Sequence, residues 1–112
     1  MNNRSSLSKS NNTPWMDTLT LISVISQKDD QGFETPTESS RTIDCNFYDG
    51  VSRGEFYESL KAGKKASATV EIWPEDYQKE DIAEYGGTRY SVLRHYPSGY
   101  GTIFLILEEV VH

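Results

Sequence analysis

The sequence is poor in cysteine and has no long apolar run. Cys45 is the single cysteine among 112 residues, so an internal disulfide is excluded, and this usage suits a reducing compartment. No apolar stretch approaches the ~20 residues that a bilayer-spanning helix needs, and the N-terminus lacks the apolar segment of a signal peptide. We therefore expect a soluble protein that is made in a cytoplasm and makes no contact with membranes.

Signatures of catalysis and metal binding are also missing. The two histidines are His95 and His112, and no Cys/His spacing is typical of a zinc site. The acidic run from Glu75 to Glu84 lacks the residue order of a calcium-binding loop, and we interpret it as a solvated face. Neither a phosphate-binding glycine loop nor a dinucleotide fingerprint occurs. These absences predict a protein that is not an enzyme and that holds no metal and no cofactor.

Positive charge is in short supply as well. The chain has 11 lysines and arginines against 17 aspartates and glutamates, a net charge of −6. A protein with this balance gains little from releasing the counterions of a nucleic acid. A grip on DNA or RNA that is independent of sequence is therefore not expected.

What the sequence does contain is a series of strand patterns separated by turns. In residues 41–49, Ile43, Cys45 and Phe47 alternate with polar residues, which is typical of a half-buried strand. The last run, residues 102–111, is apolar on both faces, which indicates a strand that is central or paired against a neighbouring subunit. The expected strands occupy residues 15–26, 41–49, 65–73, 81–85, 88–96 and 102–111.

Strands at hairpin spacing predict a mainly β fold. The expected architecture is a small antiparallel β-barrel of about six strands, with one short α-helix inserted between strands 2 and 3. Residues 14–112 would form this single domain. Residues 1–13 are rich in Asn and Ser, so we expect a disordered N-terminal tail that is either inert or ordered by a partner.

The expected helix begins after Ser52. Ser52 and Glu55 have the spacing of a capping box, and Gly63 supplies the C-terminal stop. Phe56 and Leu60 lie one turn apart, and we expect them to dock on the sheet because so short a helix is marginal alone. The predicted core is Leu21, Ile43, Cys45, Phe47, Phe56, Leu60, Val70, Ile72, Val92, Phe104 and Ile106.

Residues 27–40 are the longest polar connection in the domain. Gly32 and Pro36 predict a turn that widens into a loop. Phe33 is the only large apolar residue in this segment, too little to pin it to a core. We therefore expect a mobile loop.

Four stretches carry a likeness to a known family. They are DTLTLISVISQKDDQGFETPTES, IDCNFYDGVSRGEFYESLKAGKKASATVEIW, IAEYGGTRYSVLRHY and IFLILEEVV, and together they cover about residues 15–111. In order and spacing they resemble the small head–tail joining proteins of tailed bacteriophages, also called head-closure or stopper proteins. That family tends to have steps like SRGEF at the helix start and YSV after the glycine turn. Here the N-terminal tail is longer and residues 74–84 are more charged than in many members.

The resemblance implies a β-barrel with an added helix, whose subunits self-associate into a ring beneath the portal and its adaptor. Such a ring closes the DNA-filled capsid and offers a docking surface for tail proteins, while double-stranded DNA passes nearby without sequence-specific binding. The protein would then reside in the virion, assembled in the host bacterial cytoplasm. The candidate channel or interface loop comprises Asp29, Asp30, Gln31, Gly32, Phe33 and Glu34. The candidate interface residues of the helix are Arg53, Glu55, Tyr57 and Glu58.

Two other functions remain open. One is a tail-completion or tail-terminator-like structural role. The other is a small barrel module that binds single-stranded nucleic acid by stacking bases on Tyr48, Trp73, Tyr90 and Tyr96. The net charge of −6 opposes the second, because such modules use a basic groove.

Overall fold

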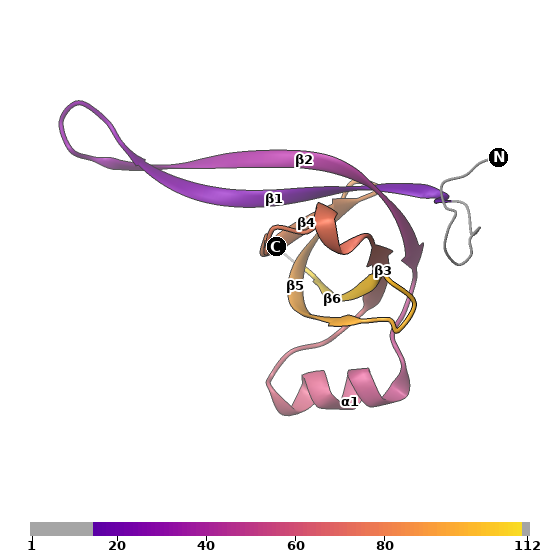
Figure 1. Ribbon diagram of the computed structural model, residues 1–112. Coiled ribbons are helices and arrows are strands. Elements are labelled where there is room, and N and C mark those ends of the chain that lie inside the picture. Colours follow the sequence, from indigo (N-terminus) through magenta and orange to yellow (C-terminus); the bar gives the residue numbers. More distant parts are fainter. Residues whose placement is uncertain (1–14, 111–112) are drawn as a thin grey trace.

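The computed structural model describes residues 15–110 as a closed β-barrel with one helix outside it (Figure 1). The predicted tail, residues 1–13, lies outside the described residues, as do residue 14 and residues 111–112. The predicted fold class, a mainly β antiparallel barrel of six strands with a helix between strands 2 and 3, is confirmed. The elements are β1 (Asp17–Lys28), β2 (Glu34–Tyr48), α1 (Arg53–Lys61), β3 (Ala68–Ile72), the 3-10 turn η2 (Pro74–Asp76), β4 (Ile82–Tyr85), β5 (Thr88–Pro97) and β6 (Ile103–Glu109).

The barrel closes in the order β1-β2-β3-β6-β5-β4, and β4 returns to β1. All of its pairings are antiparallel. The β4–β5 hairpin turns at Gly86 and Gly87, whose φ angles of 58° and 82° lie in the left-handed region that glycine tolerates. Two adjacent glycines supply the pair of positive φ angles that this tight turn requires.

Aliphatic side chains from facing strands fill the barrel interior. Leu19 and Leu21 of β1 cluster with Val70 of β3 and with Leu105 and Leu107 of β6, and all of them are fully buried. The tight interior explains why small residues also occur in it. Further members of this cluster are Ile43, Cys45, Ala68, Ile72 and Ala83, with Phe47 and Val92 packed against it.

The predicted core contained Phe104 and Ile106 of β6, but these residues do not point into the barrel. Leu105 and Leu107 point into the barrel, whereas Phe104 is partly exposed and contacts the ring of Tyr96. Ile106 is buried, as predicted, but on the outer side of the barrel, in the groove beneath α1. Because β6 is apolar at every position from 103 to 107, a period of two does not distinguish its faces. The run is apolar on both sides because the barrel covers one face and the helix overhangs the other.

The helix begins and ends as predicted but does not dock as predicted. The Ser52 hydroxyl accepts a hydrogen bond from the Glu55 amide at 3.2 Å, which confirms the N-cap. Glu55, Ser59 and Ala62 face the barrel at spacings of four and three residues. No residue of α1 is buried, and Leu60 is 46% exposed, so the predicted docking of Leu60 is wrong and Phe56 is buried only in part.

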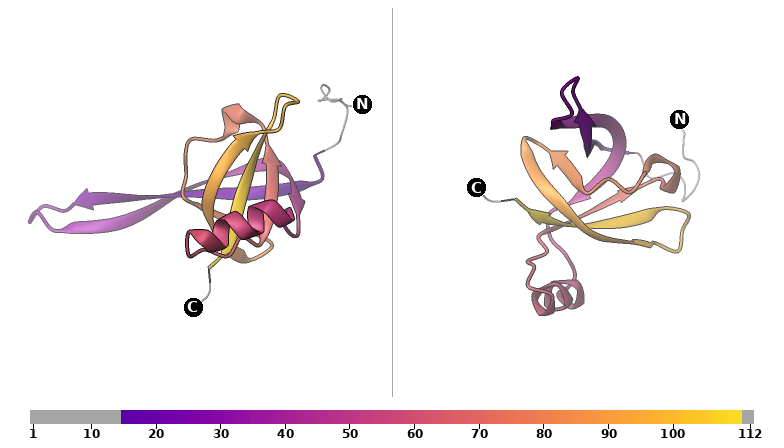
Figure 2. Two further views of the ribbon diagram at one scale, coloured as in Figure 1. Left: turned by 90° about the horizontal axis from the view of Figure 1, so that it is seen from below. Right: turned by 90° about the vertical axis from the view of Figure 1, so that its left-hand side faces the viewer.

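The β1 and β2 strands leave the barrel together as a two-stranded ribbon, residues 23–40 (Figures 1 and 2). The predicted loop at residues 27–40 is therefore wrong, because the strands remain paired as far as Lys28 and Glu34. The Asp29 carboxylate closes the turn by accepting hydrogen bonds from the amides of Gln31 and Phe33, both at 2.9 Å. Neither face of the ribbon is buried, so its sequence lacks the apolar alternation by which a strand is recognised.

The ribbon gives the molecule an elongated shape. The molecule extends over 53 × 36 × 23 Å, with a radius of gyration of 15.9 Å. A compact domain of this length would have a radius of gyration of about 13 Å. The projecting hairpin, which points away from the barrel in both figures, accounts for the difference.

Candidate functional site

The ribbon exposes backbone as well as side chains. β1 pairs with β4 only at residues 20–22, and β2 pairs with β3 only at residues 46–48. Beyond these residues the two outer edges of the ribbon have no neighbouring strand in the described part of the chain. Isolated two-stranded ribbons are marginally stable in water, and open edges invite other chains to pair. Residues 23–40 therefore form a ribbon whose two edges and two faces are open to solvent.

The surface of the ribbon combines apolar and acidic side chains. Val24, Ile25 and Phe33 are 55%, 46% and 69% exposed, and every residue from 24 to 40 is classed as exposed. Phe33 lies at the tip, directly after the turn, where it touches no core residue. The tip, residues 28–34, also carries Asp29, Asp30, Glu34 and a single cation, Lys28.

Buried polar contacts fix the root of the ribbon. The Arg41 guanidinium donates to the Glu80 carboxylate at 2.6 Å and to the Asp76 carbonyl oxygen at 2.7 Å. Burial raises the pKa of Glu80, but the hydrogen bonds from Arg41 and from the Gln78 amide outweigh it and hold that pKa below its ordinary value. Glu80 is only 4% exposed, so the interpretation of residues 75–84 as a wholly solvated face is wrong at this position.

A second ion pair supports the ribbon slightly further out. Arg89 of β5 donates to the Glu38 carboxylate at 2.9 Å, and this interaction raises the pKa of Arg89 above its ordinary value. Together the two arginines tie β2 to η2 and to β5. The direction in which the ribbon leaves the barrel is therefore set by the fold, whereas its tip is unsupported.

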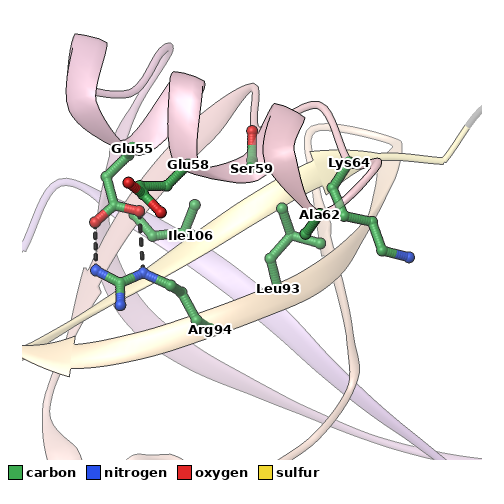
Figure 3. Close-up of a pocket in the computed structure, with 8 residues that line it drawn as sticks. All are labelled: Glu55, Glu58, Ser59, Ala62, Lys64, Leu93, Arg94 and Ile106. Carbon is green, nitrogen blue, oxygen red and sulfur yellow. Dashed lines mark hydrogen bonds and ion pairs between the residues drawn. The ribbon is translucent and has the colours of Figure 1, made fainter.

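A groove separates α1 from β5 and β6 (Figure 3). It has a volume of about 530 Å³. Ile106 and Leu93 form its apolar floor, and Ala62 contributes a small side chain from the helix. The lining residues are Glu55, Glu58, Ser59, Ala62, Lys64, Leu93, Arg94 and Ile106.

The two ends of the groove differ in charge. At one end Arg94 makes two hydrogen bonds to the Glu55 carboxylate, which neutralises both groups (Figure 3). At the other end the helix stops in a left-handed turn at Gly63 (φ 76°), and the Lys64 amide donates to the Ser59 carbonyl oxygen at 2.8 Å. The side chains of Lys64 and Lys65 are exposed and form no ion pair with any residue in 15–110. The Glu108 carboxylate accepts a hydrogen bond from the Lys65 amide at 2.9 Å, so two lysines and one carboxylate leave this end with a net positive charge.

The structure places the two sets of predicted interface residues on different parts of the molecule. The tip of the ribbon carries Asp29, Asp30, Gln31, Gly32, Phe33 and Glu34 together. Of the helix residues, Glu55 and Glu58 line the groove, while Arg53 and Tyr57 are exposed and do not line it. Figure 2 shows the ribbon and α1 on different sides of the barrel. The structure does not bring the two sets together within one chain.

Sequence reasoning missed the floor and the basic end of the groove. Leu93 directly follows the apolar Val92, so it interrupts the alternation of β5, and it has no ladder partner on β6. Arg94 lies next to a β-bulge, where β5 shifts register between Val92 and Arg94. Lys64 was visible in the sequence only as a charge favourable to the end of a helix, and Lys65 only as the start of an expected strand.

Two further buried groups are structural. Burial, with Asp17 and Asp44 nearby, raises the pKa of Cys45 to about 12, so it is a thiol that packs in the core, as predicted. The buried Glu71 carboxylate accepts hydrogen bonds from Thr102 at 2.6 Å and Asn46 at 3.5 Å. Asn46 and Glu71 are buried on the side of their strands opposite the core residues, and these hydrogen bonds satisfy their polar atoms.

The four aromatic residues proposed to stack nucleic-acid bases do not form one platform. Tyr90 packs against the core beside Phe47, with ring centroids 5.9 Å apart. Trp73 is partly buried and meets Trp15 edge to face at 5.2 Å. Of the four, only Tyr48 is strongly exposed. This arrangement gives the nucleic-acid alternative no support.

Residues 15–110 contain neither a membrane-spanning helix nor a cluster of metal ligands. No helix there is long and apolar enough to cross a membrane. Within the same residues, no three His, Cys, Asp or Glu side chains are grouped so that they could hold a metal ion. In the comparisons with known proteins, no protein-family model matches the chain and no curated protein matches it.

Proposed function

We propose that this protein is a structural subunit of the head–tail connector of a tailed bacteriophage. Its copies form part of a ring beneath the portal and adaptor, where they close the DNA-filled capsid and receive the tail. The role requires assembly surfaces and no catalytic chemistry. The order of sequence stretches that resembles head–tail joining proteins suggests this class, and the barrel with its helix between β2 and β3 is compatible with it.

One observation carries the proposal: the projecting ribbon. A paired ribbon that exposes Val24, Ile25 and Phe33 is costly for a protein that works alone, because apolar surface and open edges favour association. The ribbon is rooted by two arginine–carboxylate pairs, so it is held ready for a contact. These features are those of a subunit built for assembly.

The charge of the molecule fits a position around a DNA conduit. A net charge of −6 repels phosphates, so a duplex can pass without adhering. A gel-shift experiment at low salt, with single-stranded and duplex DNA, separates this role from nucleic-acid binding. We expect no shifted band with either strand form, and a shift at micromolar protein would favour the binding module.

The proposal is tested on the phage that encodes the chain. Mass spectrometry of purified virions should detect the protein, and removal of its gene should yield capsids that lose DNA alongside free, complete tails. Adding the purified protein to such lysates should restore tailed particles. Normal infectious particles in the absence of the gene would rule out the connector role.

A further inference from the structure

The ribbon tip and the groove beneath α1 both leave apolar side chains uncovered within residues 15–110. The tip offers one large apolar side chain, Phe33, which is 69% exposed. The groove offers a hollow of about 530 Å³ with an apolar floor of Leu93 and Ile106. An exposed aromatic anchor and an apolar pocket are complementary in the way that interface anchors generally are.

The charges of the two surfaces are complementary as well. Beside Phe33 the tip carries Asp29, Asp30 and Glu34 against Lys28, so it is acidic. One end of the groove is lined by Lys64, and Lys65 follows it in the chain; neither lysine forms an ion pair within residues 15–110. The acidic groups on the groove wall are already neutralised, since Glu55 pairs with Arg94 and Glu58 with Lys61 at 3.3 Å. An acidic tip therefore meets attraction at the basic end and little repulsion from the wall.

A chain does not satisfy this contact by itself. The ribbon leaves the barrel on one side and α1 lies on another, with the tip pointing away from the helix (Figures 1 and 2). The Arg41–Glu80 and Arg89–Glu38 pairs hold the ribbon root in this direction. The tip of one copy can reach only the groove of another.

We propose that the ribbon tip of one subunit inserts Phe33 into the groove between α1 and β5–β6 of a second copy of this chain, with Asp30 facing the second copy's Lys64. The inference rests on the self-association that belongs to the proposed function, and it names the contact. Two different patches meet, so the contact is head-to-tail, and repeated contacts close into a ring or extend as a filament. It also gives the predicted interface helix a partner.

The contact is small, and this determines how it should be detected. A turn of about seven residues buries less surface than the ~1,000 Å² of a stable interface. Free subunits are then monomeric or weakly associated, and the contacts persist only where a template holds many copies together. Covalent trapping is therefore more informative than sedimentation.

The test uses the purified chain with two engineered cysteines, Gln31→Cys at the tip and Ala62→Cys in the groove. Both positions are exposed, and the native Cys45 is buried and does not compete. Mild oxidation should give a ladder of trimers and larger species, since every copy carries both halves of the contact. The control pair, Gln31→Cys with Tyr100→Cys, has an exposed second site outside the groove, and we expect at least tenfold less of these species.

Two further variants test the named residues in the double-cysteine background. Phe33→Ser should reduce the ladder at least fivefold, and Phe33→Leu should preserve most of it. Lys64→Glu should also reduce the ladder, and adding Asp30→Lys to the same chain should restore it by exchanging the charges. Restoration cannot come from a folding defect, so it isolates the pairing.

The contrary outcomes are equally definite. Equal ladders from the groove pair and the Tyr100 pair, or no ladder from either, would overturn the proposal. The single variant Gln31→Cys is also oxidised. If it gives as much cross-linked protein as the variant with Ala62→Cys added, the tips pair with each other and the proposal is wrong. The experiment contains no phage component. If no ladder forms but the protein is needed for intact virions, only this contact is wrong. If the ladder forms but phage without the gene are still infectious, only the connector role is wrong.

Discussion

The barrel and the ribbon are made from the same two strands, yet they are held by different forces. In the barrel half of β1 the apolar residues Leu19, Leu21 and Ile22 are buried. In the ribbon half the apolar residues Val24 and Ile25 are exposed. Both halves have the same backbone pairing with β2. The barrel half is stabilised by burial of apolar surface, and the ribbon half has only its ladder and cross-strand pairs.

Strand pairing and burial of side chains are therefore independent of each other in this protein. A strand can continue beyond its core when its ladder is intact and its turn is well made. Here the Asp29 carboxylate closes the turn and Arg89 braces β2 through Glu38. Such an extension adds little to the stability of the monomer, and its surface is then available for assembly. Substitutions in the two regions test whether they contribute differently to the free energy of unfolding.

The largest expected effect comes from the barrel. Leu105→Ala removes a fully buried side chain at the centre of the core and should lower the free energy of unfolding by about 2–5 kcal/mol. Val24→Ala, in the ribbon, should change it by less than about 0.5 kcal/mol. Urea unfolding followed by tryptophan fluorescence measures both. Similar losses in the two variants would mean that the ribbon is part of the cooperative core.

The next effect is expected at the junction of barrel and ribbon. Arg41→Met leaves the buried Glu80 without its cation and should cost about 2–3 kcal/mol at pH 7, since the Arg41 side chain is itself one-third exposed. Arg89→Met breaks an exposed pair and should cost clearly less than Arg41→Met, because water and salt screen an exposed pair. If the two losses were equal, burial of Glu80 would not be what makes the inner pair stronger.

The same junction predicts a dependence on pH. The pKa of Glu80 is lower in the folded protein than its ordinary value of 4.5, so the unfolded chain binds its proton more readily. This contribution to stability is complete above the unfolded pKa and is lost as the pH falls through the folded pKa. Glu80→Gln should therefore flatten the acid side of the stability profile, below about pH 4.5, in urea titrations at successive pH values. An unchanged acid slope would contradict the lowered pKa.

A smaller effect is expected from removing the outer ribbon. If residues 25–37 are replaced by an Asn-Gly turn between Val24 and Glu38, which face each other in the ladder, the register of the remaining strands is kept. No side chain in residues 25–37 is buried, so thermal unfolding should shift by less than the equivalent of about 1 kcal/mol. In the phage, the same variant should give capsids that lose DNA or fail to join tails. Closed and infectious particles would show that the ribbon has no role in assembly.

The smallest effect is expected on the outer face of α1. Leu60→Ser exchanges a side chain that is 46% exposed and should alter stability by no more than about 0.5 kcal/mol. Ser52→Ala, which removes the N-cap hydrogen bond, should cost about 1 kcal/mol and serves as the reference within the same helix. A loss above about 1.5 kcal/mol for Leu60→Ser would mean that the helix docks through Phe56 and Leu60 after all.

Local chemistry was readable from the sequence by itself. Ser52 and Gly63 delimit α1 because they satisfy backbone groups that the helix leaves free, and Gly86 and Gly87 turn β4 into β5 because they tolerate positive φ. The alternation of Ile43, Cys45 and Phe47 predicted a core face, since a strand presents every second residue to the same side. These signals sufficed for the fold class.

The tertiary structure alone decided which surfaces are covered. The strand character of residues 34–40 was hidden, because a ribbon with no buried face needs no apolar alternation. Sequence reasoning expected residues 29–34 in a mobile loop, whereas the structure places them at the end of a paired two-stranded ribbon. The floor of the groove could not be predicted, since whether Leu93 and Ile106 lie beneath α1 depends on how strands distant in sequence meet. Burial is a property of that meeting, and for β6, apolar at each position from 103 to 107, only the closed barrel selects its inner face.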